Sequence, residues 1–217
     1  QMIPCMAVGG AAFFAVYPIR RRQLARLGLA SPWLRECALL LFVLFLAGLA
    51  ALTLFPSNLW SYVMQPWRYP QEVTFWSFYP TLEQLQDRLN TLPDQLPRIL
   101  TPFPYGLKWH FSSYWFAFLF FGNMGMFLPV GFFSALLWGR ARWWKSLLIG
   151  FFLSLTIESI QFFINRGTDL DDLILNTTGA LLGYFLYQIF CVLFPKTAAR
   201  FRCHTRKEGC AQHGRAV

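Results

Sequence analysis

Residues 146–188 constrain the fold most, because two long apolar segments there flank a short acidic turn. The first segment contains Glu158, whose neighbours in the sequence are isoleucines and phenylalanines. A carboxylate at membrane depth costs on the order of 3 kcal/mol on insertion scales, and lipid offers it no hydrogen-bond partner. We therefore expect Glu158 to face the protein interior, within hydrogen-bond reach of Asn176 or Asn123 on another helix.

Polar residues recur at helical spacing on both sides of this turn. Before it, they stand four, three and four residues apart, at Ser154, Glu158, Gln161 and Asn165. After it, the same kind of stripe runs through Asp169, Asp172, Asn176, Gly179 and Gly183. Residues at these spacings share one helical face, and a short turn makes consecutive helices antiparallel neighbours. We expect the two stripes to face each other, and Gly179 and Gly183 to let a neighbouring helix approach closely.

The composition is that of a membrane protein. Of the 217 residues, 56% are hydrophobic and only 13% are charged, and several long runs carry no charge. The net charge of +9 comes from basic residues beside the apolar runs, as the positive-inside rule predicts, so we expect no nucleic-acid partner. The five cysteines are too scattered for a disulfide framework, and Cys203, His204, Cys210 and His213 match no standard zinc spacing. We expect neither a metal nor a cofactor.

The sequence divides into four parts of different composition. These are two N-terminal transmembrane helices in 1–55 (apolar runs 2–17 and 37–55), an extracytoplasmic aromatic and amphipathic loop at 56–111, a core of three transmembrane helices at 112–194, and a basic cytoplasmic tail at 195–217. Basic residues follow the first run, separate the third and fourth spans, and fill the tail. The predicted fold class is therefore an all-α polytopic membrane bundle of about five transmembrane helices, starting outside and ending in the cytoplasm.

The long loop contains a second kind of helical pattern. Leucines repeat at intervals of three and four residues, at Leu82, Leu85, Leu89, Leu92 and Leu96. This spacing predicts an amphipathic helix, and Pro93 and Pro97 are expected to break or bend its end. We interpret the loop as lying partly on the membrane surface, where its many aromatic rings are favoured. The alternative is a solvated linker.

Together these residues resemble a known family. The residues at the spacings of the VanZ-like core signature are Ser154, Glu158, Gln161, Arg166, Asp169, Asp172, Asn176, Gly179 and Gly183. The preceding helix resembles the family's asparagine–proline segment, at Asn123, Phe127, Pro129 and Gly131. The resemblance covers about residues 100–190. It implies a multi-pass protein of the bacterial plasma membrane with a role at the cell envelope, because the name-giving member confers low-level resistance to the glycopeptide teicoplanin. It implies no particular reaction.

We interpret the polar residues as a binding pocket that opens to the outer surface. Its members are Asn123, Glu158, Gln161, Arg166, Asp169, Asp172 and Asn176. Such a pocket could bind the head group of a membrane lipid or of a lipid-linked cell-wall precursor. Arg166 would face a phosphate or carboxylate, which its fork of donors suits, and the amides would supply neutral hydrogen bonds.

Two alternatives remain open. In an intramembrane enzyme acting on a lipid or lipid phosphate, Glu158 would be a general acid or base, and Asp169 and Asp172 could hold Mg²⁺ with it. The sequence offers no Ser/His or Cys/His pair to accompany them. In a purely structural or interaction protein, the acidic residues would favour the N-terminal end of a helix dipole, with Thr168 and Asp171 resembling a capping box. That account leaves Glu158 at depth unexplained, so the pocket is preferred.

Overall fold

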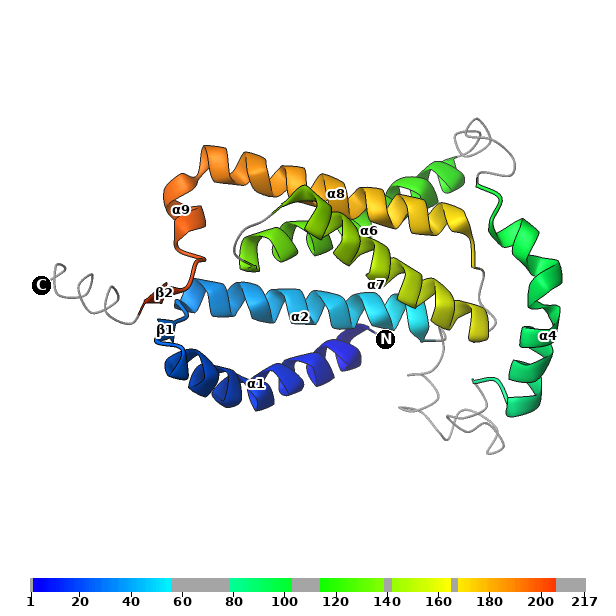
Figure 1. Cartoon of the computed structure of the whole chain (residues 1–217), viewed down its shortest axis with the longest axis horizontal. Coiled ribbons are helices and arrows are strands. Elements are labelled where there is room, and N and C mark those ends of the chain that lie inside the picture. Colours follow the sequence, from blue (N-terminus) through cyan, green and yellow to red (C-terminus); the bar gives the residue numbers. More distant parts are fainter. Residues whose placement is uncertain (1, 56–78, 103–113, 139–141, 165–167, 206–217) are drawn as a thin grey trace, which may run out of the picture.

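Helices dominate the computed structural model, which describes residues 2–55, 79–102, 114–138, 142–164 and 168–205. Five of the described helices are long and apolar enough to cross a membrane: α1 (Met2–Arg26), α2 (Trp33–Leu54), α6 (Tyr114–Leu137), α7 (Trp143–Phe163) and α8 (Leu170–Leu193). At 1.5 Å per residue each exceeds the roughly 30 Å of a bilayer core. Figure 1 shows them side by side. The predicted all-α bundle of five spans is confirmed.

The closest helix contact joins α6 and α8, which have the most extensive contact of any described pair. At Gly131 on α6, a Cβ would overlap the carbonyl oxygen of Ala180 on α8. At Gly183 on α8, a Cβ would overlap the Leu128 carbonyl oxygen on α6. The predicted close approach at the α8 glycines is therefore present, and the helix that packs against them is α6.

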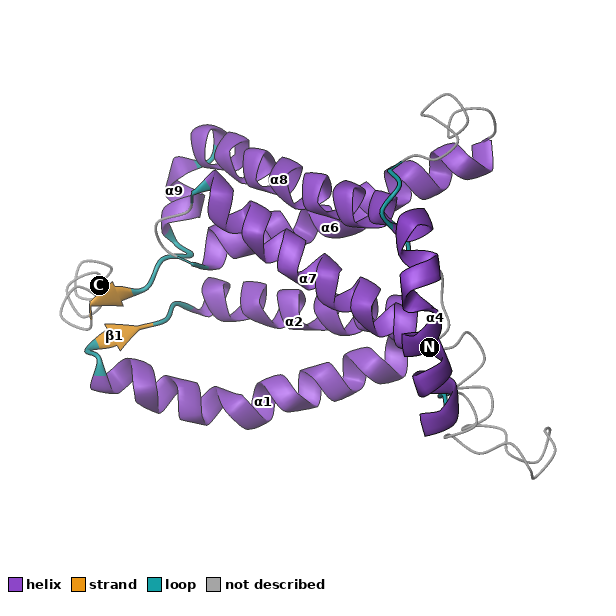
Figure 2. Cartoon of the chain, turned by 45° about the vertical axis from the view of Figure 1, so that its right-hand side comes forward, coloured by secondary structure: helices purple, strands orange, loops and turns teal. Residues whose placement is uncertain are grey.

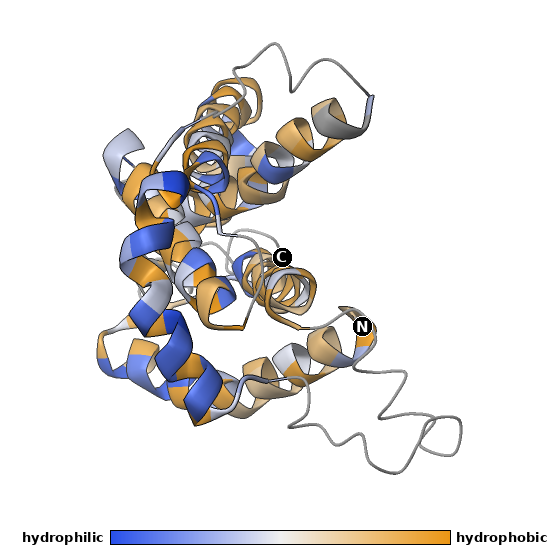
Figure 3. Ribbon diagram, turned by 90° about the vertical axis from the view of Figure 1, so that its right-hand side faces the viewer, coloured by the Kyte–Doolittle hydropathy of each residue, from blue (hydrophilic) through white to orange (hydrophobic). Residues whose placement is uncertain are grey.

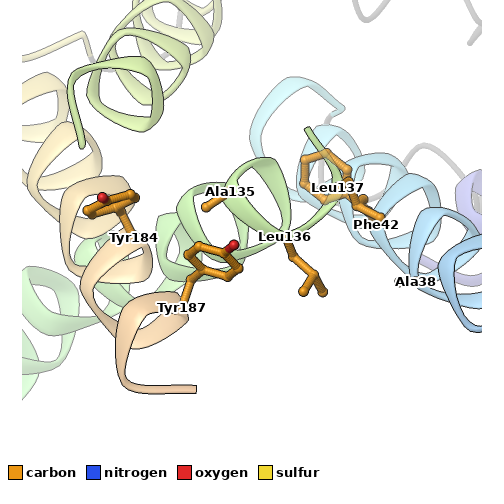
Figure 4. Close-up of a cluster of buried hydrophobic side chains, with 7 residues drawn as sticks. All are labelled: Ala38, Phe42, Ala135, Leu136, Leu137, Tyr184 and Tyr187. Atoms are coloured by element: carbon orange, nitrogen blue, oxygen red, sulfur yellow. The ribbon is translucent and has the colours of Figure 1, made fainter. Parts of the chain in front are cut away.

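The second helix, α2, packs across α6 through two apolar clusters. In the first, Phe42 stacks on Phe133 with ring centroids 5.6 Å apart, near the C-terminal end of α6. Figure 4 shows this cluster, in which Phe42 and Leu137 meet from α2 and α6. The second cluster buries Leu49 with α6 residues and with α7. Helix α2 is therefore held to the three-helix core by side-chain packing.

The first helix lies at the margin of the bundle, beside α2 (Figure 2). None of its residues is buried. Small residues allow the contact, because a Cβ at Gly9 would lie only 2.8 Å from the Ala47 Cβ. Arg20 and Glu36 form an ion pair between the two helices. The apolar run was predicted at 2–17, but the helix continues through Pro18 to Arg26, where the ion pair anchors its second half.

A shorter helix, α4 (Leu82–Ile99), lies across one end of the bundle (Figure 1). It begins with a capping box, in which Thr81 and Gln84 exchange side-chain and backbone hydrogen bonds. Its residues alternate between hydrophilic and hydrophobic in Figure 3, as predicted for an amphipathic helix. The helix continues through Pro93 and Pro97 to Ile99, so of the two expected outcomes, a break or a bend, the break does not occur. No α4 residue is buried, and carbonyls that these prolines leave without a donor can therefore reach solvent or head groups.

The two ends of the bundle differ in charge. At one end, which we call the basic end, α2 and α7 begin and α1, α6 and α8 finish (Figure 1). The basic residues described there are Arg20, Arg21, Arg22, Arg26, Arg35, Arg142, Lys145, Lys196, Arg200 and Arg202. The short helix α9 (Pro195–Ala199) and the strand pair β1 (Leu29–Ala30) and β2 (His204–Thr205) also lie there. At the other, acidic end, α8 begins after Asp169 with Asp171 and Asp172 in its first turn.

The contact between α6 and α8 can be tested at one glycine. A Cβ in Gly183→Ala would overlap the Leu128 carbonyl oxygen and lie 2.8 Å from the Phe132 backbone nitrogen. Because both are main-chain atoms, α6 must shift, and we expect a loss of about 1–3 kcal/mol in the free energy of unfolding. Gly122→Ala is the matched control, since nothing lies within 4 Å of its added Cβ. It should be neutral or stabilise by up to about 1 kcal/mol. Equal unfolding midpoints of both variants in detergent would contradict this packing.

Candidate functional site

A group of buried and half-buried polar residues connects α6, α7 and α8 near the acidic end. We call it the polar cluster and define it as Asn123, Ser154, Glu158, Asp172 and Asn176. Glu158 is 5% exposed, Asn176 6% and Ser154 0%. Buried polar groups need hydrogen-bond partners, especially where neither water nor lipid supplies them. The partners in this cluster therefore indicate what the site can bind.

Two hydrogen bonds join the three helices. Asn176 Nδ2 on α8 donates to Ser154 Oγ on α7 over 3.0 Å. Asn123 Nδ2 on α6 donates to Asp172 Oδ1, one turn earlier on α8. The α8 stripe therefore faces α7 at Asn176, as predicted, and turns toward α6 at Asp172. Small residues bring the helices near enough for these short side chains to meet.

Glu158 lies inside the protein, as its sequence environment predicts. The described residues give no hydrogen bond between it and Asn176 or Asn123, whose amide donors go to Ser154 and Asp172. That detail of the sequence prediction is therefore wrong. Two buried oxygens, Glu158 Oε2 and Asn176 Oδ1, have no hydrogen-bond partner in the described part of the chain. The carboxyl groups of Asp172 and Asp169 act on Glu158 electrostatically, and the backbone N–H of Asp169 donates a hydrogen bond to its carboxyl group.

The start of α8 is tied to α7 by a threonine. Thr168 Oγ1 donates to the backbone carbonyl of Glu158 over 3.2 Å. The N-cap residue of α8 is Asp169, in extended conformation, and its side chain makes no capping hydrogen bond. The predicted capping box of Thr168 and Asp171 is therefore wrong. The Thr168 hydroxyl instead bonds to α7. This bond depends on how the two helices pack, which residue spacing within one helix does not reveal.

The remaining predicted site residues lie in different places. Gln161, three residues after Glu158, donates from Nε2 to the backbone carbonyl of Thr53 on α2 over 3.0 Å. It therefore fastens the end of α2 to α7. Asp169 is exposed at the edge of the cluster. Arg166 lies outside the described residues. Ser154 was not among the predicted site residues, although its four-residue spacing from Glu158 marked it as a neighbour on the same face.

Within the described part of the chain, the cluster offers hydrogen-bond acceptors and no histidine beside its serine. Among the described residues, no three His, Cys, Asp or Glu side chains are placed to hold a metal ion. The hydroxyl of Ser154 accepts a hydrogen bond from Asn176 and has no histidine beside it; the one described histidine, His204, is in β2 at the basic end. An unsatisfied buried acceptor costs about 1–3 kcal/mol. A ligand that donates hydrogen bonds to Glu158 and Asn176 would recover that free energy.

The bond between Ser154 and Asn176 can be measured against a second serine on α7. Ser154→Ala removes the acceptor of Asn176 Nδ2 in a buried site, and we expect a loss of roughly 1 kcal/mol in the free energy of unfolding. Ser159→Ala is the control, because Ser159 is exposed and bonds only the Leu155 carbonyl of its own helix. Its unfolding transition in detergent should remain near that of the parent. Equal losses in the two variants would show that the interhelical bond adds no stability.

Comparison with known proteins places the chain in a family. The sequence matches the VanZ/LLP1 family over residues 42–191, which include α6 and α7 and most of α2 and α8. No curated protein sequence and no solved structure matches the chain. The matched region contains every residue of the polar cluster and the glycines that join α6 to α8. It covers well over half of the sequence, and the chain is therefore a multi-spanning helical membrane protein of the VanZ/LLP1 family.

Proposed function

We propose that the polar cluster binds the head group of a membrane lipid or of a lipid-linked cell-wall precursor. The observation that carries the proposal is the pair of buried oxygens without hydrogen-bond partners, Glu158 Oε2 and Asn176 Oδ1. They belong to facing helices, α7 and α8, whose side chains already meet at Ser154. A head group that donates to both oxygens would bridge the two helices and satisfy the buried acceptors.

The depth of the cluster suits a head group. Glu158 lies five residues before Phe163, the last residue of α7, which is roughly 8 Å along the helix axis. Asp172 is in the first turn of α8, and Asp169 is exposed beside it. The acceptors therefore extend from the helix ends into the bundle, over the depth at which lipid head groups meet the acyl region.

The electrostatics favour the donor-bearing part of the ligand. The carboxyl groups of Asp169 and Asp172 act electrostatically on Glu158, and Asp169 also acts on Asp172. Among the described residues of the cluster, none is basic. Amine and hydroxyl groups are therefore the best match, since both donate hydrogen bonds and an ammonium also offsets negative charge. Head groups with a free amine, glycerol or sugar hydroxyls carry such donors.

The proposed orientation follows from charge. Arginines and lysines gather at the basic end, and such clusters are retained in the cytoplasm. The polar cluster at the acidic end then faces the outer leaflet of the bacterial plasma membrane. A protein that holds lipid or precursor head groups there could change how a glycopeptide of the teicoplanin type reaches its target, which is the role that the VanZ-like resemblance implies.

A purely structural cluster accounts less well for these residues. Interhelical hydrogen bonds in membranes contribute about 0.6 kcal/mol on average, whereas burying a carboxylate costs several times more. If Glu158 were purely structural, both of its carboxyl oxygens would be expected to form hydrogen bonds. Its Oε2 forms none among the described residues. Among the described residues, no histidine accompanies the Ser154 hydroxyl, and no group of three ligands is placed to hold a metal ion beside the carboxyl groups. Binding of a donor ligand is the better explanation for an acceptor that is buried and left open.

The orientation can be tested by labelling single cysteines in a cysteine-free background. Asp87→Cys lies on α4 at the acidic end, where the polar side chain of Asp87 is exposed. Lys196→Cys lies on α9 at the basic end and is also exposed. We expect a membrane-impermeant maleimide to label the first in intact cells and the second only after permeabilisation. Labelling of Lys196→Cys in intact cells would overturn the orientation and the outer-leaflet site with it.

Binding can be tested with Glu158→Gln. The amide keeps the shape of the side chain but cannot ionise and replaces one oxygen with a donor. We expect the purified protein to retain its unfolding midpoint and to bind co-purifying or added lipid about tenfold more weakly by native mass spectrometry, because one hydrogen bond to the carboxyl group is lost. Bacteria expressing this variant should lose any teicoplanin resistance that the parent chain confers.

Glu83→Gln is the matched control for that experiment. Glu83 lies in the first turn of α4 and is exposed, so the same chemical change occurs outside the polar cluster. Lipid binding and teicoplanin susceptibility should equal those of the parent. Equal lipid occupancy in the Glu158→Gln and Glu83→Gln variants would reduce Glu158 to a structural residue and refute the proposal.

A further inference from the structure

A recess at the basic end lies far from the polar cluster. It has a volume of about 810 Å³ and forms where the start of α2, the ends of α6 and α8, and the segment after α9 meet. Its polar lining includes Arg35, Arg202, Tyr187 and Gln188, with Trp138 at the end of α6. A recess of this size is typical of small-molecule sites. The charge of its lining indicates the class of ligand.

Arg35 is fixed in the recess by contacts on two sides. Its Nη2 donates to the backbone carbonyl of Leu137 over 2.8 Å, and its Nη1 donates to the Cys203 sulfur. The guanidinium is therefore held between the end of α6 and the C-terminal segment. Its Nε is buried and has no hydrogen-bond partner among the described residues. Each Nη carries a second N–H beyond these two contacts, and a guanidinium held in one place favours an oxyanion.

A second arginine lines the same recess. Arg202 is exposed and interacts with the hydroxyl of Tyr187, which projects from α8 beside Leu136 (Figure 4). No aspartate or glutamate is among the described lining residues. The nearby Glu36 is already paired with Arg20 on the adjoining side of α2. Two arginines thus face one recess without a carboxylate to neutralise them, and an anion would supply the missing charge.

The remaining walls are suited to acyl chains. Phe201 and the α6 residues before Trp138 make one side of the recess apolar. The neighbouring end of α8 leaves Val192 79% exposed and Leu193 64% exposed, as expected for a surface that faces lipid. Trp138 is itself 55% exposed, and tryptophan favours the membrane interface. Basic recesses between membrane helices at the cytoplasmic side are typical sites for anionic lipid head groups.

We propose that this recess binds the phosphate group of an anionic phospholipid in the leaflet at the basic end. Arg35 and Arg202 take the phosphate oxygens, Tyr187 and Gln188 lie within the same polar lining, and the acyl chains run along the exposed end of α8. The site does not depend on the function proposed for the polar cluster. It differs from that cluster in chemistry, because it offers donors where the cluster offers acceptors.

The test uses the full chain in nanodiscs of phosphatidylcholine doped with phosphatidylglycerol, followed by native mass spectrometry of the released protein. We expect the parent chain to retain phosphatidylglycerol selectively. Arg202→Gln should lower that retention about fivefold, the contribution typical of one basic residue at an anionic surface. Arg202→Lys should restore most of it, because the charge returns. Arg202 is exposed, so these variants should keep the unfolding midpoint of the parent.

Arg200→Gln is the matched control. Arg200 is exposed and two residues away, carries the same charge, and does not line the recess. It should retain phosphatidylglycerol as the parent does. Equal losses in Arg200→Gln and Arg202→Gln would reduce the effect to general surface attraction and overturn the site. Displacement of the lipid by excess inorganic phosphate would show a site for free phosphate and overturn the lipid assignment. Arg35→Lys, which keeps the charge but loses the fork, should weaken retention, and unchanged retention there would contradict the role given to Arg35.

Discussion

The contact between the backbones of α6 and α8 holds the remaining parts of the bundle in position. At Gly131, Gly179 and Gly183 the helices are so close that any side chain would overlap a main-chain atom of the partner. Lipid gives apolar helices no hydrophobic reason to associate, so close packing at small residues has to supply the attraction. Helix α7 also packs closely against α8, at Gly150 opposite Ala180. Both α6 and α7 are therefore packed against α8.

The geometry of the polar cluster is a consequence of that packing. Asparagine and aspartate side chains are short, and Asn123 can reach Asp172 only because α6 and α8 are nearly in backbone contact. The close approach of α7 to α8 at Gly150 likewise lets Asn176 reach Ser154 on α7. Rigid helices hold a binding group more accurately than loops do, so the two open oxygens on Glu158 and Asn176 are preorganised and need little ordering when a ligand arrives.

The sequence predicts much of this arrangement, because membrane helices are specified by long apolar runs and shared faces by three- and four-residue spacing. The five spans, the burial of Glu158 and the close approach at Gly183 follow from those patterns. The hydrogen-bond partners do not. Whether Asn176 meets Glu158 or Ser154 depends on rotation of α8 by a fraction of a turn, which α6 decides. Thr168 likewise does not form the expected capping box, because its hydroxyl donates to the backbone carbonyl of Glu158 on α7.

Under the two proposals, the acidic end offers hydrogen-bond acceptors and the basic end offers donors. The protein would therefore bind different lipid groups in the two leaflets. Under the first proposal, the buried oxygens of Glu158 and Asn176 favour a hydrogen-bond donor over a bare phosphate, because burying an anion beside a carboxyl group is costly. The arginines of the basic recess exclude a cationic amine for the same reason. A lipid that bears both groups can bind through its amine or hydroxyl in the leaflet at the acidic end. In the other leaflet, a lipid of the same kind can bind through its phosphate. Selection between leaflets would then arise from the placement of charge, with the glycine-packed core fixing the distance between the two sites.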